Sequence, residues 1–462
     1  MINQINRTEN RVFEFDTNNH IQNLCENLND NSAIDARLYD KFHVKRGLRR
    51  SDGTGVVAGI TNICNVHGYI VNEGEREPME GELIYRGYNV RDLVKNVEKE
   101  DRFGFEETVY LLLFGQLPDK HELESFTEYM GSLRELPPYF IVDMILKAPS
   151  PDVMNKLARS VLALYSYDKN AEEKSLESEL RKAMSLIAKM PVIMTSAYQV
   201  KRQYYNNDSL VMHPIDPGEN TAQTILSLLR EDRQYTKEEA QLLDTLLMLH
   251  AEHGGGNNST FTCRVLTSSG TDAYSAYSAA IGSLKGSRHG GANIKVMQML
   301  EDFEKNVENW EDEGQVADHI IKILKKEAND RSGLIYGMGH AVYTLSDPRE
   351  QILKRKAFEL AEGKEIEREF CLLNTIEKLT PEIFKQVKGD EKIMCANVDM
   401  YSGLVYKMLG IPKDLFTPLF ATARLAGWSA HRMEEIMTGK RIIRPAYKAI
   451  TKPLEYIPID KR

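Results

Sequence analysis

Hydrophobic residues recur along most of the chain at the spacing of buried or amphipathic α-helices. Residues 103–118 begin with acidic side chains, continue as an apolar run, and reach Gly115 and Pro118, which are helix stop signals. Residues 238–253 carry so many leucines that little polar surface is left, which predicts a buried helix. Residues 316–329 have the period of an amphipathic helix. The pattern predicts a mostly α-helical fold.

Strand patterns are few in this sequence. The segments "YIVNEG" and "GELIYRG", within residues 69–87, predict one small hairpin near the N-terminus. Residues 166–179 are mostly charged and polar, and residues 205–220 contain two prolines and no period, so both predict surface connections. Residues 272–286 are rich in alanine, serine and glycine, which let helices approach closely. We expect this helix to be central or at a subunit contact.

The composition of the chain changes near residue 300, where charge-rich amphipathic helices begin. A chain of 462 residues is also too long for one compact core. We therefore predict a smaller, more mobile domain at residues 292–404. It is inserted into a larger helical domain made of residues 1–291 and 405–462.

Charge and cysteine usage narrow the classes of function. The net charge is −9 and the pI is near 5.8, which does not suit a nucleic-acid binder. No apolar run approaches the roughly 20 residues that span a bilayer, and the N-terminus has neither a signal core nor an Arg-rich transit pattern. The five cysteines form no CxxC pair, which predicts free thiols. We expect a cytoplasmic protein without a membrane or nucleic-acid partner.

Four turns rich in glycine or asparagine carry the candidate chemistry. Each places a titratable side chain beside a predicted helix end, and catalytic groups are often found in such loops. The four turns are "HAEHGGGNN" with His250 and His253, "KGSRHGGAN" with His289, "GMGHAVYTLSDPRE" with His340, Asp347 and Arg349, and "NVDMYSG" with Asp399.

The first turn raises the question of a metal site. His250 and His253 are three residues apart and would share a helical face. The zinc signature His-Glu-x-x-His, however, spaces its ligands four apart with the glutamate between them, whereas Glu252 directly precedes His253 here. On these residues alone, a metal site and a structural histidine both remain open.

The second turn suits acid–base chemistry. We expect Asn293 to be the N-cap of the helix that follows, which would bring the positive helix end near His289. That field disfavours an imidazolium and leaves a neutral ring that donates a hydrogen bond to a developing oxyanion. The alternative is a histidine that only caps the helix.

The third and fourth turns add a donor, an anion site and a base. Gly337 and Gly339 let the backbone before His340 approach a ligand closely. Arg349 at a rigid turn suits bidentate binding of a carboxylate. Asp399 alone could be an ordinary N-cap. Taken together, the four turns suit proton abstraction α to a carbonyl, with neutral donors that stabilise the enol.

In this order, the four motifs resemble those of the citrate synthase family. "GVVAGITNICNVHGY", "GELIYRGYNVRDLV", "FEETVYLLLFGQLP", "ATARLAGW" and "RIIRPAY" extend the resemblance over nearly the whole chain. The resemblance implies a mostly helical homodimer with a large and a small domain and an active site in the cleft between them. It implies condensation of acetyl-CoA with oxaloacetate and hydrolysis of citryl-CoA to citrate and CoA. It also implies that no metal and no cofactor is needed.

The resemblance also implies the catalytic roles. Asp399 would be the base that removes a proton from the acetyl methyl group. His289 would donate a hydrogen bond to the thioester oxygen, and His340 would donate to the carbonyl oxygen of oxaloacetate.

Binding roles follow in the same way. His253, Arg349 and Arg424 would bind oxaloacetate within one subunit. Arg444 would reach the site from the other subunit. His250 is expected to be a core histidine.

The chain departs from the family in two places. Many members read Asp-His-Glu where this chain has Glu252-His253-Gly254, and we expect Glu252 to shape the turn. Residues 341–344 lack the basic residue that relatives usually carry, so the contacts of the CoA phosphates are unassigned. Lys285, Arg288 and Lys354 are candidates.

Three alternatives to citrate synthase stay open at this stage. A 2-methylcitrate synthase would use propionyl-CoA with the same residues, because one methylene changes discrimination by only about 1–3 kcal/mol. A non-catalytic helical scaffold of the same fold and a metallohydrolase are the others.

Overall fold

The computed structural model describes residues 34–50, 54–72, 75–389 and 393–461, with a few positions between 21 and 28. It forms two compact units. One is residues 60–444, which contain every candidate site residue, and the other consists of the described parts of residues 1–59 and 445–462. Within these described ranges, no helix is long and apolar enough to cross a membrane.

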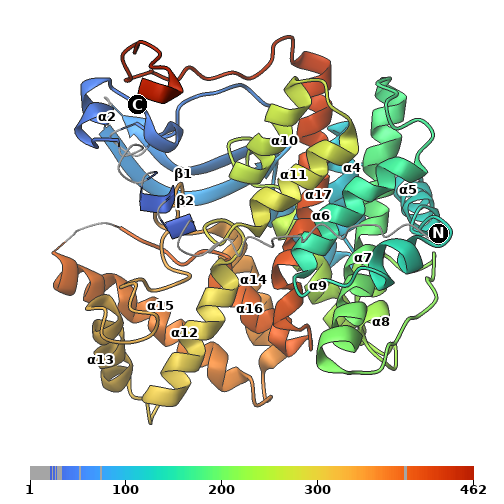
Figure 1. The fold of residues 1–462 in the computed structure, drawn as a ribbon. Helices are drawn as coiled ribbons and strands as arrows, with labels where there is room; N and C mark the ends of the chain where they lie inside the picture. The colour runs from blue at the N-terminus through green and yellow to red at the C-terminus, as the bar shows by residue number, and fades with distance from the viewer. Residues whose placement is uncertain are drawn as a thin grey trace, which may run out of the picture. The chain divides into compact units, whose positions relative to one another are not determined.

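The unit formed by residues 60–444 is mostly helical, as the sequence predicts (Figure 1). Its α-helices are α3 (Val90–Lys99), α4 (Phe105–Phe114), α5 (Lys120–Ser132), α6 (Val153–Leu164), α7 (Leu176–Asn206), α8 (Thr221–Leu229), α9 (Lys237–His250), α10 (Asn258–Ser268), α11 (Ala273–Lys285), α12 (Ala292–Asn306), α13 (Glu313–Leu324), α14 (Pro348–Ala361), α15 (Glu367–Lys388), α16 (Asp399–Met408) and α17 (Phe416–Thr438). The other unit contains α2 (Arg37–Lys41) and two short 3-10 turns, Arg46–Leu48 and Ile459–Lys461.

Helix boundaries follow the sequence signals in several places. Helix α4 has its acidic residues in the first turn and ends at Gly115, whose φ of 81° suits a glycine C-cap. Helix α9 begins with a capping box between Thr236 and Glu239. The predicted surface connection at 166–179 is partly wrong, because α7 begins at Leu176 and Glu179 is buried.

The predicted hairpin is confirmed and is longer than expected. Strands β1 (Cys64–Asn72) and β2 (Glu75–Tyr85) pair antiparallel, with Cys64 opposite Tyr85, and β3 (Tyr88–Asn89) pairs with β2. The hydroxyl of Tyr85 donates to the backbone oxygens of Met248 (3.1 Å) and Glu252 (3.0 Å). The sheet therefore holds the C-terminal end of α9 in place.

Helix α17 is the buried centre of this unit. It packs against α4, α6, α7, α9, α10 and α11 (Figure 1). At Gly427 the helix meets the turn after α9: the Gly427 N–H donates to the carbonyl of Ala251 at 3.1 Å. A Cβ at Gly427 would lie 2.4 Å from that carbonyl oxygen, so only glycine permits this approach.

Helices α12 to α16 pack on one another, and α14 also packs on α3, α9 and β2. The two turns that carry His340 and Asp399 come from this group, whereas His253 follows α9. The domain division at residues 292 and 404, with movement of the smaller part, stays a prediction. Helix α11 buries Ala273, Ala276 and Ala280 completely, so these three alanines pack within the chain. This agrees with the expectation that the helix is central.

Candidate active site

His253 lies in the glycine turn that follows α9. Gly254 has a φ of +89°, so the chain turns sharply just after the histidine. The ring of His253 is 5.1 Å from that of His340 and 5.5 Å from that of Tyr343, measured between centroids. Burial, and then the charge of Arg349, hold the pKa of His253 well below its usual value. Its Nε2 is buried and has no hydrogen-bond partner among the described residues, so a ligand atom can be received there.

His340 has its protonation fixed by the backbone. The N–H groups of Val342 and Tyr343 both donate to its Nδ1 at 3.1 Å. Nδ1 therefore carries the lone pair, and a neutral ring carries its proton on Nε2. The ring stacks on Tyr343 with 4.6 Å between centroids. His340 is thus oriented as a donor through Nε2, and its role toward oxaloacetate, which the resemblance implies, stays a prediction.

Arg424 is a buried cation with unused donors. It lies in α17 with no exposed surface, and its Nε donates to the carbonyl of His250 at 2.7 Å. Nη1 and Nη2 have no hydrogen-bond partner in the part of the chain that the structure describes. Leaving such groups unpaired costs about 1–3 kcal/mol each, so the arrangement suits a site built to receive a carboxylate.

Arg349 is held by a carboxylate of its own chain. Its Nε and Nη2 donate to the two oxygens of Asp347 at 3.0 and 2.7 Å. Asp347 also accepts from the N–H of Arg349 at 3.0 Å and so caps α14. This pairing fixes the direction of the guanidinium. A substrate carboxylate would have to use the donors that do not face Asp347.

Asp399 is the first residue of α16 and lies half-buried beside these arginines. It is not an N-cap, because that position is Val398. Burial raises the pKa of Asp399 to about 6, although Arg349 opposes the shift. The carboxylate is therefore a stronger base than an ordinary aspartate and is still largely ionised at pH 7.

His289 lies in the turn between α11 and α12. The N–H of Ser259, in the first turn of α10, points at its Nε2 from 3.3 Å, and the Ser259 hydroxyl lies 3.0 Å from the same atom. Nε2 therefore accepts, and the neutral ring carries its proton on Nδ1. Burial, and then Arg424, lower the pKa of His289 to about 4. The prediction of a neutral donor agrees with this geometry.

The reason that the sequence offered for the neutral His289 is wrong. Helix α12 begins at Ala292 with Gly291 as its N-cap, and Asn293 is buried inside the first turn. Asn293 therefore caps nothing. The helix end that contacts His289 belongs to α10, and burial is the larger cause of the lowered pKa.

Arg444 is exposed at the end of the unit. The adjacent Ile443 N–H donates to the hydroxyl of Ser268 at 3.0 Å. Within the residues the structure describes, no interaction joins Arg444 to the other candidate residues, so its contribution from a second subunit stays a prediction. His250 is fully buried with its ring 4.4 Å from that of Phe420, as expected of a core histidine.

The candidate residues for binding the CoA phosphates differ in whether they already pair with a carboxylate of the chain. Lys354 is 2.8 Å from Glu377, and Lys285 is 3.3 Å from Asp152. Arg288 is exposed beside His289. Arg288 is therefore the cation that a phosphate could recruit with the least competition from carboxylates.

Sequence reasoning missed several residues that shape the site. Tyr343 was considered only as a neighbour of His340, yet its ring touches both site histidines. Ser259 was overlooked, although a serine in the first turn of a helix was visible in the sequence. The partner of Glu252, His431, lies 179 residues away, and no local signal connects the two.

Comparison with known proteins bears on what these residues do. A family model described as "Citrate synthase, C-terminal domain" matches residues 50–446. The chain belongs to the citrate synthase family. It is 34% identical over 390 residues to the citrate synthase of Haloferax volcanii, covering 83% of this chain and 93% of that protein. It is 31% identical over 382 residues to the 2-methylcitrate synthase of Shewanella oneidensis, covering 82% and 92%.

Solved structures agree with this membership. The citrate synthase of Pyrobaculum aerophilum superposes with a TM-score of 0.72 at 29% identity, covering 88% of this chain and 94% of that one. The citrate synthase of Thermoplasma acidophilum, solved in a ternary complex with carboxymethyl coenzyme A and oxaloacetate, has a TM-score of 0.71 at 26% identity, covering 91% and 99%. The family membership supports a condensing enzyme that transfers an acyl group.

Proposed function

We propose that this family member is a citrate synthase, which condenses acetyl-CoA with oxaloacetate and hydrolyses citryl-CoA to citrate and CoA. One observation carries the proposal. A base of raised pKa, Asp399, lies in one unit with two histidines whose neutral rings are fixed as donors, His289 and His340. Several curated relatives at about a third identity are citrate synthases, which supports the same choice.

The proposed first step is removal of a proton from the methyl carbon of acetyl-CoA by Asp399. The electron pair moves toward the thioester oxygen, where the Nδ1–H of His289 donates a hydrogen bond to the developing charge. Asp399 is still a weak base for a carbon acid, so the step depends on this stabilisation.

In the proposed second step, the enol carbon attacks the ketone carbon of oxaloacetate. The ketone oxygen gains the electron pair of its π bond and takes a proton from the Nε2 of His340. Water then cleaves the thioester of citryl-CoA to citrate and free CoA. Every group used here belongs to the chain or the substrates, so we propose that no metal or cofactor is required.

Oxaloacetate binding is proposed to use the cations and the histidine of the pocket. Arg424 offers two unpaired nitrogens and His253 offers its Nε2, while Arg349 is oriented by Asp347. Arg444 would complete the site from the partner in a homodimer. Arg288 is the proposed contact for the CoA phosphates.

The second candidate is 2-methylcitrate synthase, which is favoured by the 31% identity to a curated protein of that name. Its chemistry would use the same residues with propionyl-CoA. The two candidates differ only in the room for one extra methylene beside the acyl group.

The deciding experiment measures free-thiol release from acetyl-CoA and oxaloacetate, with propionyl-CoA in parallel. Asp399→Asn removes the base, and Asp318→Asn, an exposed aspartate on α13, is the matched control. Fast release with acetyl-CoA that is lost only in Asp399→Asn supports the proposal. A preference for propionyl-CoA moves the protein to the methylcitrate reaction. No release with either substrate overturns both.

A further inference from the structure

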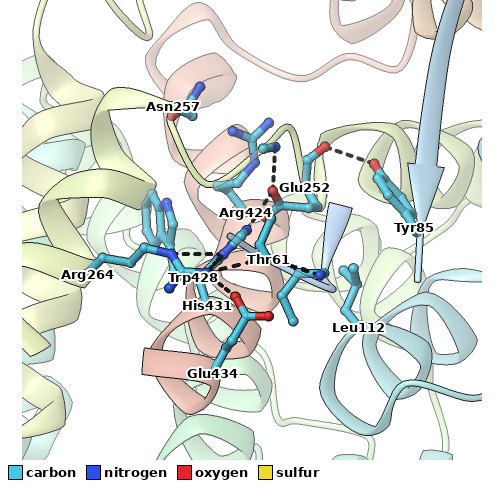
Figure 2. A network of polar contacts seen from close by, with 12 residues as sticks. Thr61, Tyr85, Leu112, Glu252, Asn257, Arg264, Arg424, Trp428, His431 and Glu434 are labelled. Carbon is cyan, nitrogen blue, oxygen red and sulfur yellow. Dashed lines mark hydrogen bonds and ion pairs between the residues drawn. The ribbon is translucent and has the colours of Figure 1, made fainter. Parts of the chain in front are cut away.

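A chain of polar contacts links Arg264, His431 and Glu252, the residue that directly precedes His253 in the sequence (Figure 2). Glu252 and His431 both have no exposed surface, and the Nε2 of His431 is 3.0 Å from the Oε1 of Glu252. The Nη2 of Arg264 is 2.6 Å from the Nδ1 of His431. The mechanism proposed above uses none of these three residues.

The protons of this chain can be assigned from chemistry. A guanidinium only donates, so the Nδ1 of His431 must accept from Arg264. His431 therefore carries a proton on Nε2 and donates it to Glu252. Arg264 in turn binds Glu434 and, at 3.0 Å, Glu435. The cation is thus balanced at one end of the chain and the His431 ring is locked in one tautomer.

The carboxylate at the other end holds the turn. The N–H of Gly254 donates to the Oε1 of Glu252 at 2.5 Å, across His253. Burial alone would raise the pKa of Glu252, but His431 and Arg424 outweigh it and keep the group ionised. A Cβ on Gly427 would lie 2.1 Å from the Oε2 of Glu252, so α17 closes the space around this carboxylate. The Gly254 turn is therefore held by the Oε1 of Glu252 on its N–H and by the N–H of Asn257, which donates to the Gly254 carbonyl at 3.1 Å.

We propose that Arg264, His431 and Glu252 are positioning residues that hold the Gly254 turn and so aim His253 at oxaloacetate. This inference rests on the proposed function for the identity of the ligand. The hydrogen bonds that hold the turn do not depend on that function. Where many members read Asp-His-Glu, this chain has Glu252 before His253, and its carboxylate accepts from the Gly254 N–H beyond the histidine.

Substitutions of Glu252 separate the effect of its negative charge from the effect of the hydrogen bond that it accepts from Gly254. Loss of the charge alone should not raise the oxaloacetate KM, whereas loss of the acceptor should raise it. Glu252→Gln keeps an oxygen that accepts from Gly254 and His431 but removes a negative charge near Arg424. If geometry matters, the oxaloacetate KM stays the same or falls, because the pocket becomes more positive. Glu252→Ala removes the acceptor, so the KM should rise about 10-fold or more while kcat changes less than about threefold.

His431 offers a second matched pair. His431→Gln places an amide N–H near the position of Nε2 and should recover most of the oxaloacetate affinity. His431→Phe keeps the ring volume but donates nothing, and its KM should rise as in Glu252→Ala. Thermal unfolding of all four variants checks that they are folded. If Glu252→Ala does not fold, His431→Phe tests the predicted rise in KM, and if His431→Phe does not fold, Glu252→Ala tests it.

Hydrogen exchange of the segment 250–258 provides a readout that does not depend on activity. Loss of protection at Gly254 in Glu252→Ala, with protection kept in Glu252→Gln, supports the inference even if no thiol release is found. Unchanged protection and an unchanged KM in a folded Glu252→Ala would overturn it. Equal rises in KM for Glu252→Gln and Glu252→Ala would also overturn it, because the acceptor oxygen that Gln keeps would then make no difference. Absence of oxaloacetate binding by the unmodified protein would instead count against the proposed function.

Discussion

Two buried arginines of α17 should respond in opposite ways to the same substitution. Arg424 and Arg432 are 0% and 2% exposed, and both are surrounded by protein. Arg432 has its donors paired with Glu179, Thr267 and the carbonyl of Thr271. Arg424 makes one hydrogen bond and leaves two nitrogens unpaired. We predict that Arg424→Met stabilises the ligand-free protein and that Arg432→Met destabilises it.

The magnitude follows from the hydrogen bonds that each substitution changes. In Arg424→Met, removing two unpaired buried groups gains about 1–3 kcal/mol each, and losing the bond to His250 costs about 1.5–3 kcal/mol. At the middle of each range the net gain is about 2 kcal/mol, which raises Tm by about 1–4 °C in a protein of this size. In Arg432→Met, the buried Glu179 keeps only its ion pair with Lys182 at 3.6 Å, so the cost should be below the about 3–5 kcal/mol of a buried charge that loses its sole partner.

Differential scanning fluorimetry with and without oxaloacetate tests both signs. Ligand bound only to the folded state raises Tm, so the unmodified protein should shift with oxaloacetate. Arg424→Met should start from a higher Tm and lose that shift, because its carboxylate donors are gone. A lower starting Tm for Arg424→Met, or an undiminished response to oxaloacetate, would refute the reasoning that the two free nitrogens are reserved for a substrate.

Three further predictions concern pH and packing. Because the pKa of Asp399 is raised to about 6 in the ligand-free protein, kcat/KM should fall as the pH is lowered through about 6, and a flat pH profile of kcat/KM down to pH 5 would contradict its role as the base. Burial, and then Glu106, raise the pKa of Asp244 to about 7 from 3.8, so the folded state binds this proton more tightly and the stability contribution of Asp244 is lost as the pH rises from about 4 to about 7. The unfolding free energy of Asp244→Asn minus that of the unmodified protein should therefore rise by about 2–3 kcal/mol from pH 5 to pH 8, measured by urea unfolding. A difference that does not change with pH would count against the raised pKa. Gly427→Ala should cost about 2–3 kcal/mol in the same unfolding assay, because the new methyl would meet the carbonyl of Ala251 at 2.4 Å, and a neutral effect would mean that the two segments separate easily.

Local patterns predicted the helices, and the residues explain why. Helix α4 has acidic residues at its start and Gly115 at its end, and both signals act within one turn. By contrast, α7 runs through Pro191 for 31 residues, where a sequence pattern alone would end the helix. Packing overrides the local preference there, since Pro191 is buried in the core.

The candidate site was likewise predicted in part from local sequence features. His253, His289, His340 and Asp399 were found because each lies in a sequence motif rich in glycine or asparagine, which is a local feature. The neutral state of His289 was predicted, but its cause was not, because it depends on burial and on distant groups such as Ser259, whose N–H reaches His289 across 30 residues. Local propensity misplaced the N-cap at Asn293, since the N-cap is Gly291, two residues earlier.

The charges of the pocket lead us to predict that a second subunit contributes to oxaloacetate binding. Arg349 and Arg424 face three carboxylates, namely Asp347, Asp399 and Glu252. The histidines with lowered pKa add no charge at pH 7. A dianionic substrate would add two more negative charges to a pocket that already has more carboxylates than arginines. We therefore predict that a lone chain binds oxaloacetate weakly and that another cation contributes to the site.

Arg444 is the predicted source of that cation, and mixing variants tests whether it crosses between subunits. Arg444→Gln should raise the oxaloacetate KM about 10-fold or more without lowering Tm, because Arg444 is exposed in the single chain. Arg444→Gln and Asp399→Asn should each be nearly inactive at low oxaloacetate. If the partner's Arg444 serves each site, unfolding and refolding the two variants together restores activity, because mixed dimers contain one site with both native residues. If Arg444 serves its own chain, every site in the mixture lacks one residue and no activity returns, which would refute the shared site.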